Sequence, residues 1–197
     1  MRSFSVWFIL LVLIEIAFFI TSPDQYTLRF KAGPFFVLLA ISILILPVQT
    51  SFEELFFRGY LMQGVGNLFK SPWIAWLSTS IAFGAMHIWN PEVSQFGMVK
   101  MMVYYMSFGL FLGAVTLIDN TLELALGIHA ANNIYSAVIV GFSGSALQTP
   151  SIFYLKDLDV NFMLIGYLIA VIIYILVFFR RSKYKIWTKL FVWKSTE

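Results

Sequence analysis

Three short stretches of this chain carry polar side chains of the kinds that catalyse hydrolysis. The first is TSFEELFFRG at 50–59, where Glu53, Glu54 and Arg58 follow a long apolar run. In a helix, Glu54 and Arg58 lie on one face and can pair, whereas Glu53 points about 100° round the helix. The arginine then neutralises one carboxylate, and Glu53 is left available as a base.

The chain has two histidines, His87 in the stretch FGAMHIWNP and His129 in the stretch LGIHAANNIY. On a helix, His129 and Asn133 share a face, while Asn132 points elsewhere. Polar side chains in membrane spans usually face the interior of the helix bundle. We therefore expect three apolar segments to bring Glu53, both histidines and Asn133 to a common chamber.

Such a cluster is suited to peptide-bond hydrolysis without a covalent nucleophile. A poorly solvated carboxylate can take a proton from water near neutral pH. A histidine can orient that water or return the proton to a leaving amine, and Asn and His donors can stabilise the developing oxyanion. One Glu and two His would also make a zinc set with water as the fourth ligand, although the H-E-x-x-H signature is absent.

The same residues also have structural interpretations. Ser51 and Glu54 have the spacing of a capping box, so the acidic pair could instead begin a helix whose dipole favours negative charge there. A lone histidine near the end of an apolar segment is more often an interfacial or satisfied core residue. From the residues alone, both interpretations remain open.

The elements that must position these residues are membrane helices. Of the 197 residues, 60% are hydrophobic and 12% are charged, and the mean hydropathy is +0.84, which indicates an integral membrane protein. The length suits one transmembrane domain over 1–197. The absence of Cys excludes a disulfide framework, a thiolate metal site and a cysteine nucleophile.

We predict an all-α fold, a polytopic bundle of about six membrane helices, because the apolar runs are long and lack the two-residue alternation of a barrel. The expected spans are 4–20, 34–48, 72–88, 98–118, 122–142 and 160–179. Pro47 is expected to kink or split the second of them. Glu15 interrupts the first span without an evident partner. Gly109 and Gly113 form a G-x-x-x-G that would let two helices approach closely.

The ends of the chain indicate its orientation. The first span follows Arg2 and lacks a signal-peptide cleavage site, so we expect an uncleaved anchor. A basic tail at 180–197 follows the last span, with Arg180, Arg181, Lys183, Lys185, Lys189 and Lys194. By the positive-inside bias the tail is cytoplasmic, and an even number of spans puts the N-terminus there too. We interpret the tail as topogenic rather than as a contact for anionic lipid or nucleic acid.

All three stretches match motifs of one family, in that family's order. EELFFR at 53–58 matches E-E-x-x-x-R, FGAMH at 83–87 matches F-x-x-x-H, and HAANN at 129–133 matches H-x-x-x-N. The chain thus resembles the CPBP family, which includes the CAAX prenyl endopeptidases and the bacterial Abi proteins. The resemblance covers roughly residues 34–142, the expected catalytic core.

The resemblance implies an intramembrane endopeptidase that acts on a membrane-associated peptide or protein. Glu53 matches the glutamate thought to activate water, and Glu54 and Arg58 match the pair that shapes the site. The family is often labelled metalloprotease, but a metal-free glutamate mechanism is also argued for it. We favour the general-base mechanism and keep zinc, held by Glu53, His87 and His129, as the open alternative.

The other motifs imply further roles. His87 matches the second catalytic residue, His129 and Asn133 match residues of the oxyanion site, and Phe83 is expected to pack. Many members have more spans than we count here, which leaves room for a partner protein or a homo-oligomer beside membrane lipid. The expected location is a bacterial cytoplasmic membrane. A non-enzymatic immunity or scaffold protein of the Abi type is the alternative function, and a proton-coupled transporter is disfavoured because inverted repeats are not evident.

Overall fold

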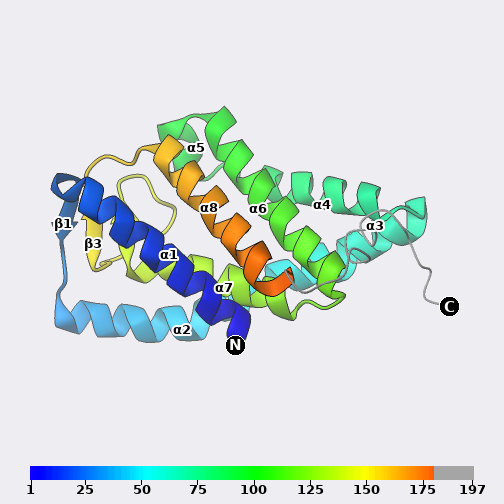
Figure 1. The fold of residues 1–197 in the computed structure, drawn as a ribbon, viewed down its shortest axis with the longest axis horizontal. Helices are drawn as coiled ribbons and strands as arrows, with labels where there is room; N and C mark the ends of the chain where they lie inside the picture. Colours follow the sequence, from blue (N-terminus) through cyan, green and yellow to red (C-terminus); the bar gives the residue numbers. More distant parts are fainter. Residues whose placement is uncertain (180–197) are drawn as a thin grey trace.

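The fold is described for residues 1–179 of a computed structural model (Figure 1). Helices make up most of it, and they run in chain order as α1 (Arg2–Thr21), α2 (Ala32–Glu54), the π-helical segment η2 (Leu55–Leu61), α3 (Met62–Phe69), α4 (Pro72–Met86), α5 (Pro91–Phe96), α6 (Met98–Asp119), α7 (Glu123–Val138) and α8 (Val160–Phe179). The predicted basic tail lies outside the described residues.

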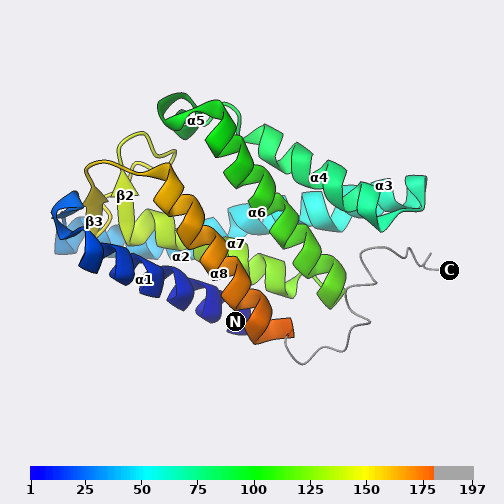
Figure 2. The same cartoon turned by 45° about the horizontal axis from the view of Figure 1, so that its top comes forward.

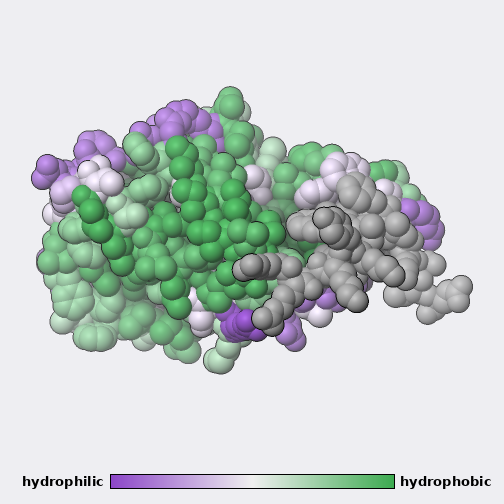
Figure 3. Space-filling view, in the orientation of Figure 1, coloured by the Kyte–Doolittle hydropathy of each residue, from purple (hydrophilic) through white to green (hydrophobic). Residues whose placement is uncertain are grey.

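The helices form a membrane bundle, as predicted. Within the described residues four helical stretches are long and apolar enough to cross a bilayer: α1, the continuous run Ala32–Phe69, α6 and α8. Helices α4 and α7 have 15 and 16 residues, fewer than the roughly 20 that a straight span needs. All six predicted segments are therefore helical, but two of them are short. Apolar residues cover most of the face in Figure 3, with hydrophilic residues gathered at its edges.

The segment that carries Glu53 and Glu54 differs in two ways from the expectation for it: Pro47 does not split the helix, and the glutamates end the helix rather than begin one. Helix α2 begins at Ala32 and continues past Pro47, so Pro47 does not split it. Ser51 and Glu54 lie at the end of this helix, and the capping-box interpretation is wrong. The next residues widen into the π-helical segment Leu55–Leu61, which contains Arg58. π-Helical turns inside longer helices occur frequently at functional sites.

Helix α4 packs tightly on α6 through the predicted G-x-x-x-G. A Cβ at Gly109 would lie 3.0 Å from the carbonyl oxygen of Ser80, and one at Gly113 would lie 2.7 Å from the Trp76 ring. The Trp76 indole also donates to the carbonyl of Leu110 at 2.7 Å. Ser71 and Pro72 start α4 directly after α3, and the Ser71 hydroxyl accepts from the amide of Ile74. This close packing fixes the position of His87 at the end of α4.

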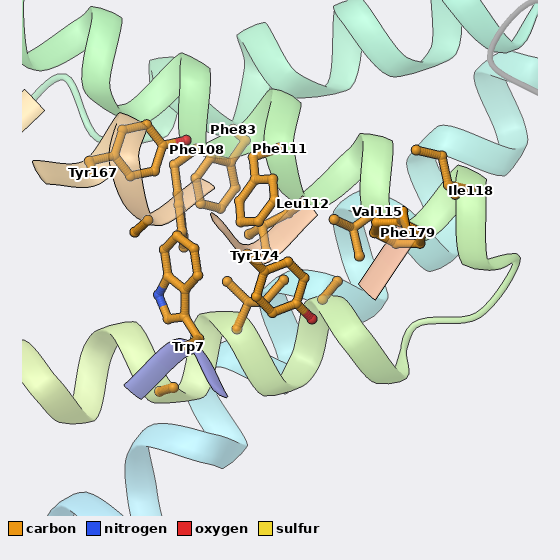
Figure 4. Close-up of a cluster of buried hydrophobic side chains, with 14 of the residues drawn as sticks. Trp7, Phe83, Phe108, Phe111, Leu112, Val115, Ile118, Tyr167, Tyr174 and Phe179 are labelled. Atoms are coloured by element: carbon orange, nitrogen blue, oxygen red, sulfur yellow. The ribbon is translucent and has the colours of Figure 1, made fainter. Parts of the chain in front are cut away.

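An aromatic cluster joins α1, α6 and α8 (Figure 4). Trp7 of α1 is fully buried, and its ring centroid lies 5.2 Å from Phe111, 5.8 Å from Tyr174 and 6.5 Å from Tyr167. Aromatic pairs at such spacings and tilted geometries add to the free energy gained by burial. The cluster holds the N-terminal helix against the last helix of the bundle.

The two ends of the described chain lie together. The Ser3 hydroxyl contacts the Tyr174 hydroxyl at 2.7 Å, and the Arg2 guanidinium lies 5.6 Å from the centroid of the Phe178 ring. Helices α1 and α8 therefore run antiparallel, with the start of one beside the end of the other, as Figures 1 and 2 show.

A small sheet, not expected from the sequence, caps the other end of this helix pair. Its strand order is β1-β3-β2, with β1 (Tyr26–Leu28) antiparallel to β3 (Phe153–Leu155) and β2 (Val140–Phe142) parallel to it. Strand β2 occupies the last residues of the predicted span 122–142, so that helix ends earlier than expected, at Val138.

Candidate active site

The buried centre of the site is the carboxylate of Glu54. Arg58 donates to its Oε1 at 2.7 Å, and the two side chains are almost fully enclosed, with 1% and 0% of their surfaces exposed. The guanidinium also donates to the carbonyl of Gly109 at 3.1 Å and lies 4.5 Å from the centroid of the Phe83 ring. The ion pair expected from the four-residue spacing is thus formed, and it is anchored to α6.

His129 approaches the same carboxylate from α7. Its Nδ1 lies 2.6 Å from Glu54 Oε1, and because a carboxylate only accepts, Nδ1 carries the hydrogen and donates it. The bond fixes the tautomer and directs Nε2 away from Glu54. That nitrogen lies 3.8 Å from Glu53 Oε2. One imidazole therefore lies between the two adjacent glutamates.

Glu53 occupies a different environment from Glu54, as the helical geometry predicts. Its Oε1 accepts from the Gln49 side-chain amide at 2.7 Å, one helical turn earlier on α2. Its Oε2 is buried and has no hydrogen-bond partner within the described part of the chain. Since 3.8 Å is too long for a direct hydrogen bond to His129, a water within about 2.8 Å of both atoms would satisfy them.

His87 lies near this cluster but does not touch either carboxylate. Its Nδ1 donates to the Phe83 carbonyl at 2.8 Å, and its ring is stacked on Tyr105 at a centroid distance of 4.5 Å. The Phe83 ring lies 4.8 Å from the His87 ring and 5.8 Å from the His129 ring. Both histidines therefore contact Phe83, and the Nε2 atom of His87 has no partner among the described residues.

The two asparagines of α7 lie on different faces of the helix, as their adjacent positions predict. Asn133 is half-buried, lies one turn beyond His129 and makes no hydrogen bond to a described residue. Asn132 lines a separate cavity beside α7, together with Tyr104. The amide of Asn133 thus has donors to spare for a ligand.

The three zinc ligands expected from the sequence are not all neighbours within residues 1–179. No group of three His, Cys, Asp or Glu side chains within residues 1–179 is placed to hold a metal ion. Glu53 and His129 are neighbours, but His87 stays with Phe83 and Tyr105. Glu54, which the zinc interpretation left out, is instead the closest carboxylate to His129.

Some contributors were not identified from the sequence. Gln49 could have been found by the four-residue rule that paired Glu54 with Arg58. Tyr105 and the carbonyl of Gly109 reach the site from α6, and no local pattern points to them. The Glu54–His129 bond joins residues 75 positions apart, so only the assembled fold reveals it.

The fold and the site define a polytopic helical membrane protein with a buried cluster of two carboxylates, an imidazole and a guanidinium. A family model described as type II CAAX prenyl endopeptidase Rce1-like matches residues 32–135, slightly more than half of the chain. The chain belongs to this family. The matched range contains all three motifs and every candidate site residue.

A curated relative extends the similarity beyond the motifs. The chain is 36% identical over 153 residues to the uncharacterized protein YyaK of Bacillus subtilis (strain 168). The match covers 77% of this chain and 51% of that protein, so the chain spans about half the length of the curated relative. No solved structure matches the chain.

Proposed function

We propose that this protein is an intramembrane endopeptidase that hydrolyses a peptide bond of a membrane-associated substrate with a water activated by Glu53. The proposal rests on the different hydrogen-bond partners of the two adjacent glutamates. Glu54 Oε1 is held by the charged Arg58 and by His129, whereas Glu53 Oε1 accepts only from the neutral amide of Gln49. The Oε2 atom of each glutamate is buried without a hydrogen-bond partner among the described residues, and that of Glu53 lies 3.8 Å from His129 Nε2. A structural carboxylate and a free one have different chemical uses.

The free oxygen of Glu53 accepts the proton of the attacking water. Gln49 holds the other oxygen of Glu53, so the carboxylate has a fixed orientation. The water oxygen bonds to the scissile carbonyl carbon, and the carbonyl electrons move to its oxygen to give a tetrahedral oxyanion. Glu53 then transfers the proton to the leaving nitrogen, and the C–N bond breaks.

His129 and Asn133 stabilise the oxyanion in this proposal. In the doubly protonated imidazole, Nε2 donates toward the substrate oxygen while Nδ1 stays bonded to Glu54. The unengaged amide of Asn133, one turn further along the same helix, supplies the second donor.

His87 orients the substrate or the water with its free Nε2. Its ring is held by the Phe83 carbonyl on one side and by the Tyr105 ring on the other, so the nitrogen has a fixed direction. A positioned imidazole near the reacting atoms costs little reorganisation during the reaction. The base remains Glu53, and no step requires a bound metal.

The proposed substrate reaches the site from the bilayer, because apolar side chains cover the outer surface of α2 beside the site. Ile43, Leu44, Ile45 and Val48 are all largely exposed there. In a membrane these side chains contact lipid. A partner protein or a second copy could cover the same face, and the proposed location is a cytoplasmic membrane with both chain ends on the inner side.

The test is cleavage of a membrane-anchored reporter peptide by the purified protein in liposomes. Glu53→Gln is nearly isosteric and keeps an acceptor for Gln49, so we expect normal folding but a loss of cleavage of at least about a hundredfold, the scale of general-base catalysis. Glu123→Gln, an exposed glutamate at the start of α7, is the matched control and should cleave normally.

Full activity of Glu53→Gln would remove the base from the mechanism. A protein that never cleaves but whose Glu53→Gln variant still protects cells from a peptide toxin would favour the non-enzymatic immunity alternative.

A further inference from the structure

A cavity lies beside α7, where Asn132, Tyr135 and Ser136 line it. It has a volume of about 450 Å³ and lies between α1, α7, α8 and the small sheet. This volume falls within the range of about 300–1,000 Å³ that is typical of small-molecule sites. None of Glu53, Glu54, His87 and His129 lines it.

The lining is acidic and aromatic. Glu15, Asp157 and Asp159 contribute carboxylates, and no Lys or Arg is among the lining residues. Four tyrosines and three phenylalanines also line it: Tyr26, Tyr104, Tyr135, Tyr167, Phe18, Phe142 and Phe162. Carboxylates beside aromatic faces suit an organic cation, because the charge is paired and the ring quadrupoles attract it.

Glu15 is the half-buried anchor of the cavity. Its Oε1 accepts from the Tyr26 hydroxyl and its Oε2 from the Tyr135 hydroxyl, each at 2.5 Å. Burial, followed by the hydrogen bond to Glu15, raises the pKa of the Tyr26 hydroxyl, so this tyrosine keeps its proton and donates. Each carboxylate oxygen has a second lone pair, which leaves Glu15 able to accept from a ligand as well.

The other two carboxylates lie at the exposed rim, just before α8. Asp159 accepts from the amide of Asn161 through Oδ1 at 2.8 Å, which leaves Oδ2 free. Lys156 lies next to this rim, but its ammonium donates to the carbonyl of Asp24. Apolar side chains such as Phe18, Phe162 and Met163 also line the cavity.

We propose that this cavity binds an amphiphilic organic ammonium ion, with its charged head at Glu15 and its alkyl chain against the aromatic and aliphatic wall. A zwitterionic lipid headgroup is a poorer occupant, because its phosphate would lie among three carboxylates with no lining cation. A carboxylate or phosphate ligand is excluded by the same charge argument.

The test is calorimetric titration of the full chain in a neutral sugar detergent with hexylammonium, with empty micelles as the blank. Hexanoate and hexanol, which carry the same alkyl chain, are the matched probes. We expect saturable binding of hexylammonium and none of the other two. Glu15→Gln should weaken it about tenfold or more, since a hydrogen bond to a charged group is lost. The amide oxygen keeps an acceptor for one tyrosine hydroxyl, and the amide NH2 can donate to the oxygen of the other.

Two further variants keep the test decisive. Asp159→Asn preserves the cap on α8 and removes a rim charge, so we expect weaker binding of hexylammonium with an unchanged melting temperature. Glu123→Gln, at the opposite end of α7, should bind hexylammonium as the parent protein does. Equal binding of hexylammonium and hexanol, or normal affinity in Glu15→Gln, would overturn the proposal. Displacement of hexylammonium by phosphatidylethanolamine in nanodiscs would also overturn it, by assigning the site to lipid.

Discussion

Glu54 is the residue on which the geometry of the cluster depends. One of its oxygens accepts from both Arg58 and His129, so a single carboxylate fixes a guanidinium from η2 and an imidazole from α7. All three side chains are at least 97% buried. Because none of them can exchange its partner for water, loss of one member leaves an uncompensated charge or donor in the interior.

Arg58→Ala should therefore destabilise the protein strongly. Removing one partner of a buried ion pair typically costs about 3–5 kcal/mol, because the remaining charge is unpaired. Arg29→Ala is the matched control, since Arg29 is exposed and its guanidinium lies over the Tyr154 ring rather than in an ion pair. Thermal unfolding in detergent measures both. Equal melting temperatures for the two variants would contradict the structural role of Arg58.

Chelation separates the two mechanisms that the residues alone leave open. If Glu53 is the base, treatment with EDTA or 1,10-phenanthroline should leave reporter cleavage within about twofold of the untreated rate, because no proposed step uses an ion. Loss of activity that added Zn²⁺ restores would instead favour the zinc set of Glu53, His87 and His129. Metal analysis of the same active preparation is the accompanying measurement.

At the scale of elements, the packing of α4 on α6 positions His87. Gly109→Val would push its side chain into the backbone of Ser80, which lies 3.0 Å from where a Cβ would be. Overpacking of this kind typically costs about 1–3 kcal/mol, and the shift of α4 should also reduce kcat by displacing His87. Gly64→Val on α3 is the matched control, because nothing lies within 4 Å of its Cβ.

The outcome is measured by unfolding and by cleavage together. A Gly109→Val variant that unfolds and cleaves like Gly64→Val would show that the close approach does not matter. Loss of stability with normal kcat would separate helix packing from the placement of His87.

The same elements show what the sequence could reveal. Long apolar runs identified the helices, and four-residue spacing identified the Glu54–Arg58 pair, because both signals are local in a helix. Strands β1 and β3 pair across more than a hundred positions, and segments of three residues carry no periodicity of their own. One partner of Glu15 is likewise distant, since Tyr135 reaches it from α7. Non-local contacts of this kind appear only when the bundle is assembled.

At the scale of the whole molecule, the contacts between the chain ends define its polarity. The Ser3 hydroxyl donates to the carbonyl of Leu124 at 2.7 Å and contacts Tyr174, so the start of α1, the start of α7 and the last part of α8 share one end. Asp24 and Lys156 meet at the other end. By the positive-inside bias we propose that the first end is cytoplasmic, because the basic residues 180–197 follow α8 in the sequence.

Single cysteines can test this orientation directly, because the natural chain has none. We expect Asp24→Cys to react with a membrane-impermeant maleimide on intact cells, and Glu123→Cys to react only after permeabilisation. Both positions are exposed, so accessibility to the reagent rather than burial decides the result. The reverse labelling pattern would show that the protein has the opposite orientation in the membrane, with the start of α7 on the outer side. Labelling of both sites on intact cells would contradict the prediction that a bilayer lies between these two ends. It would also contradict the inference that the apolar surface of the bundle faces lipid.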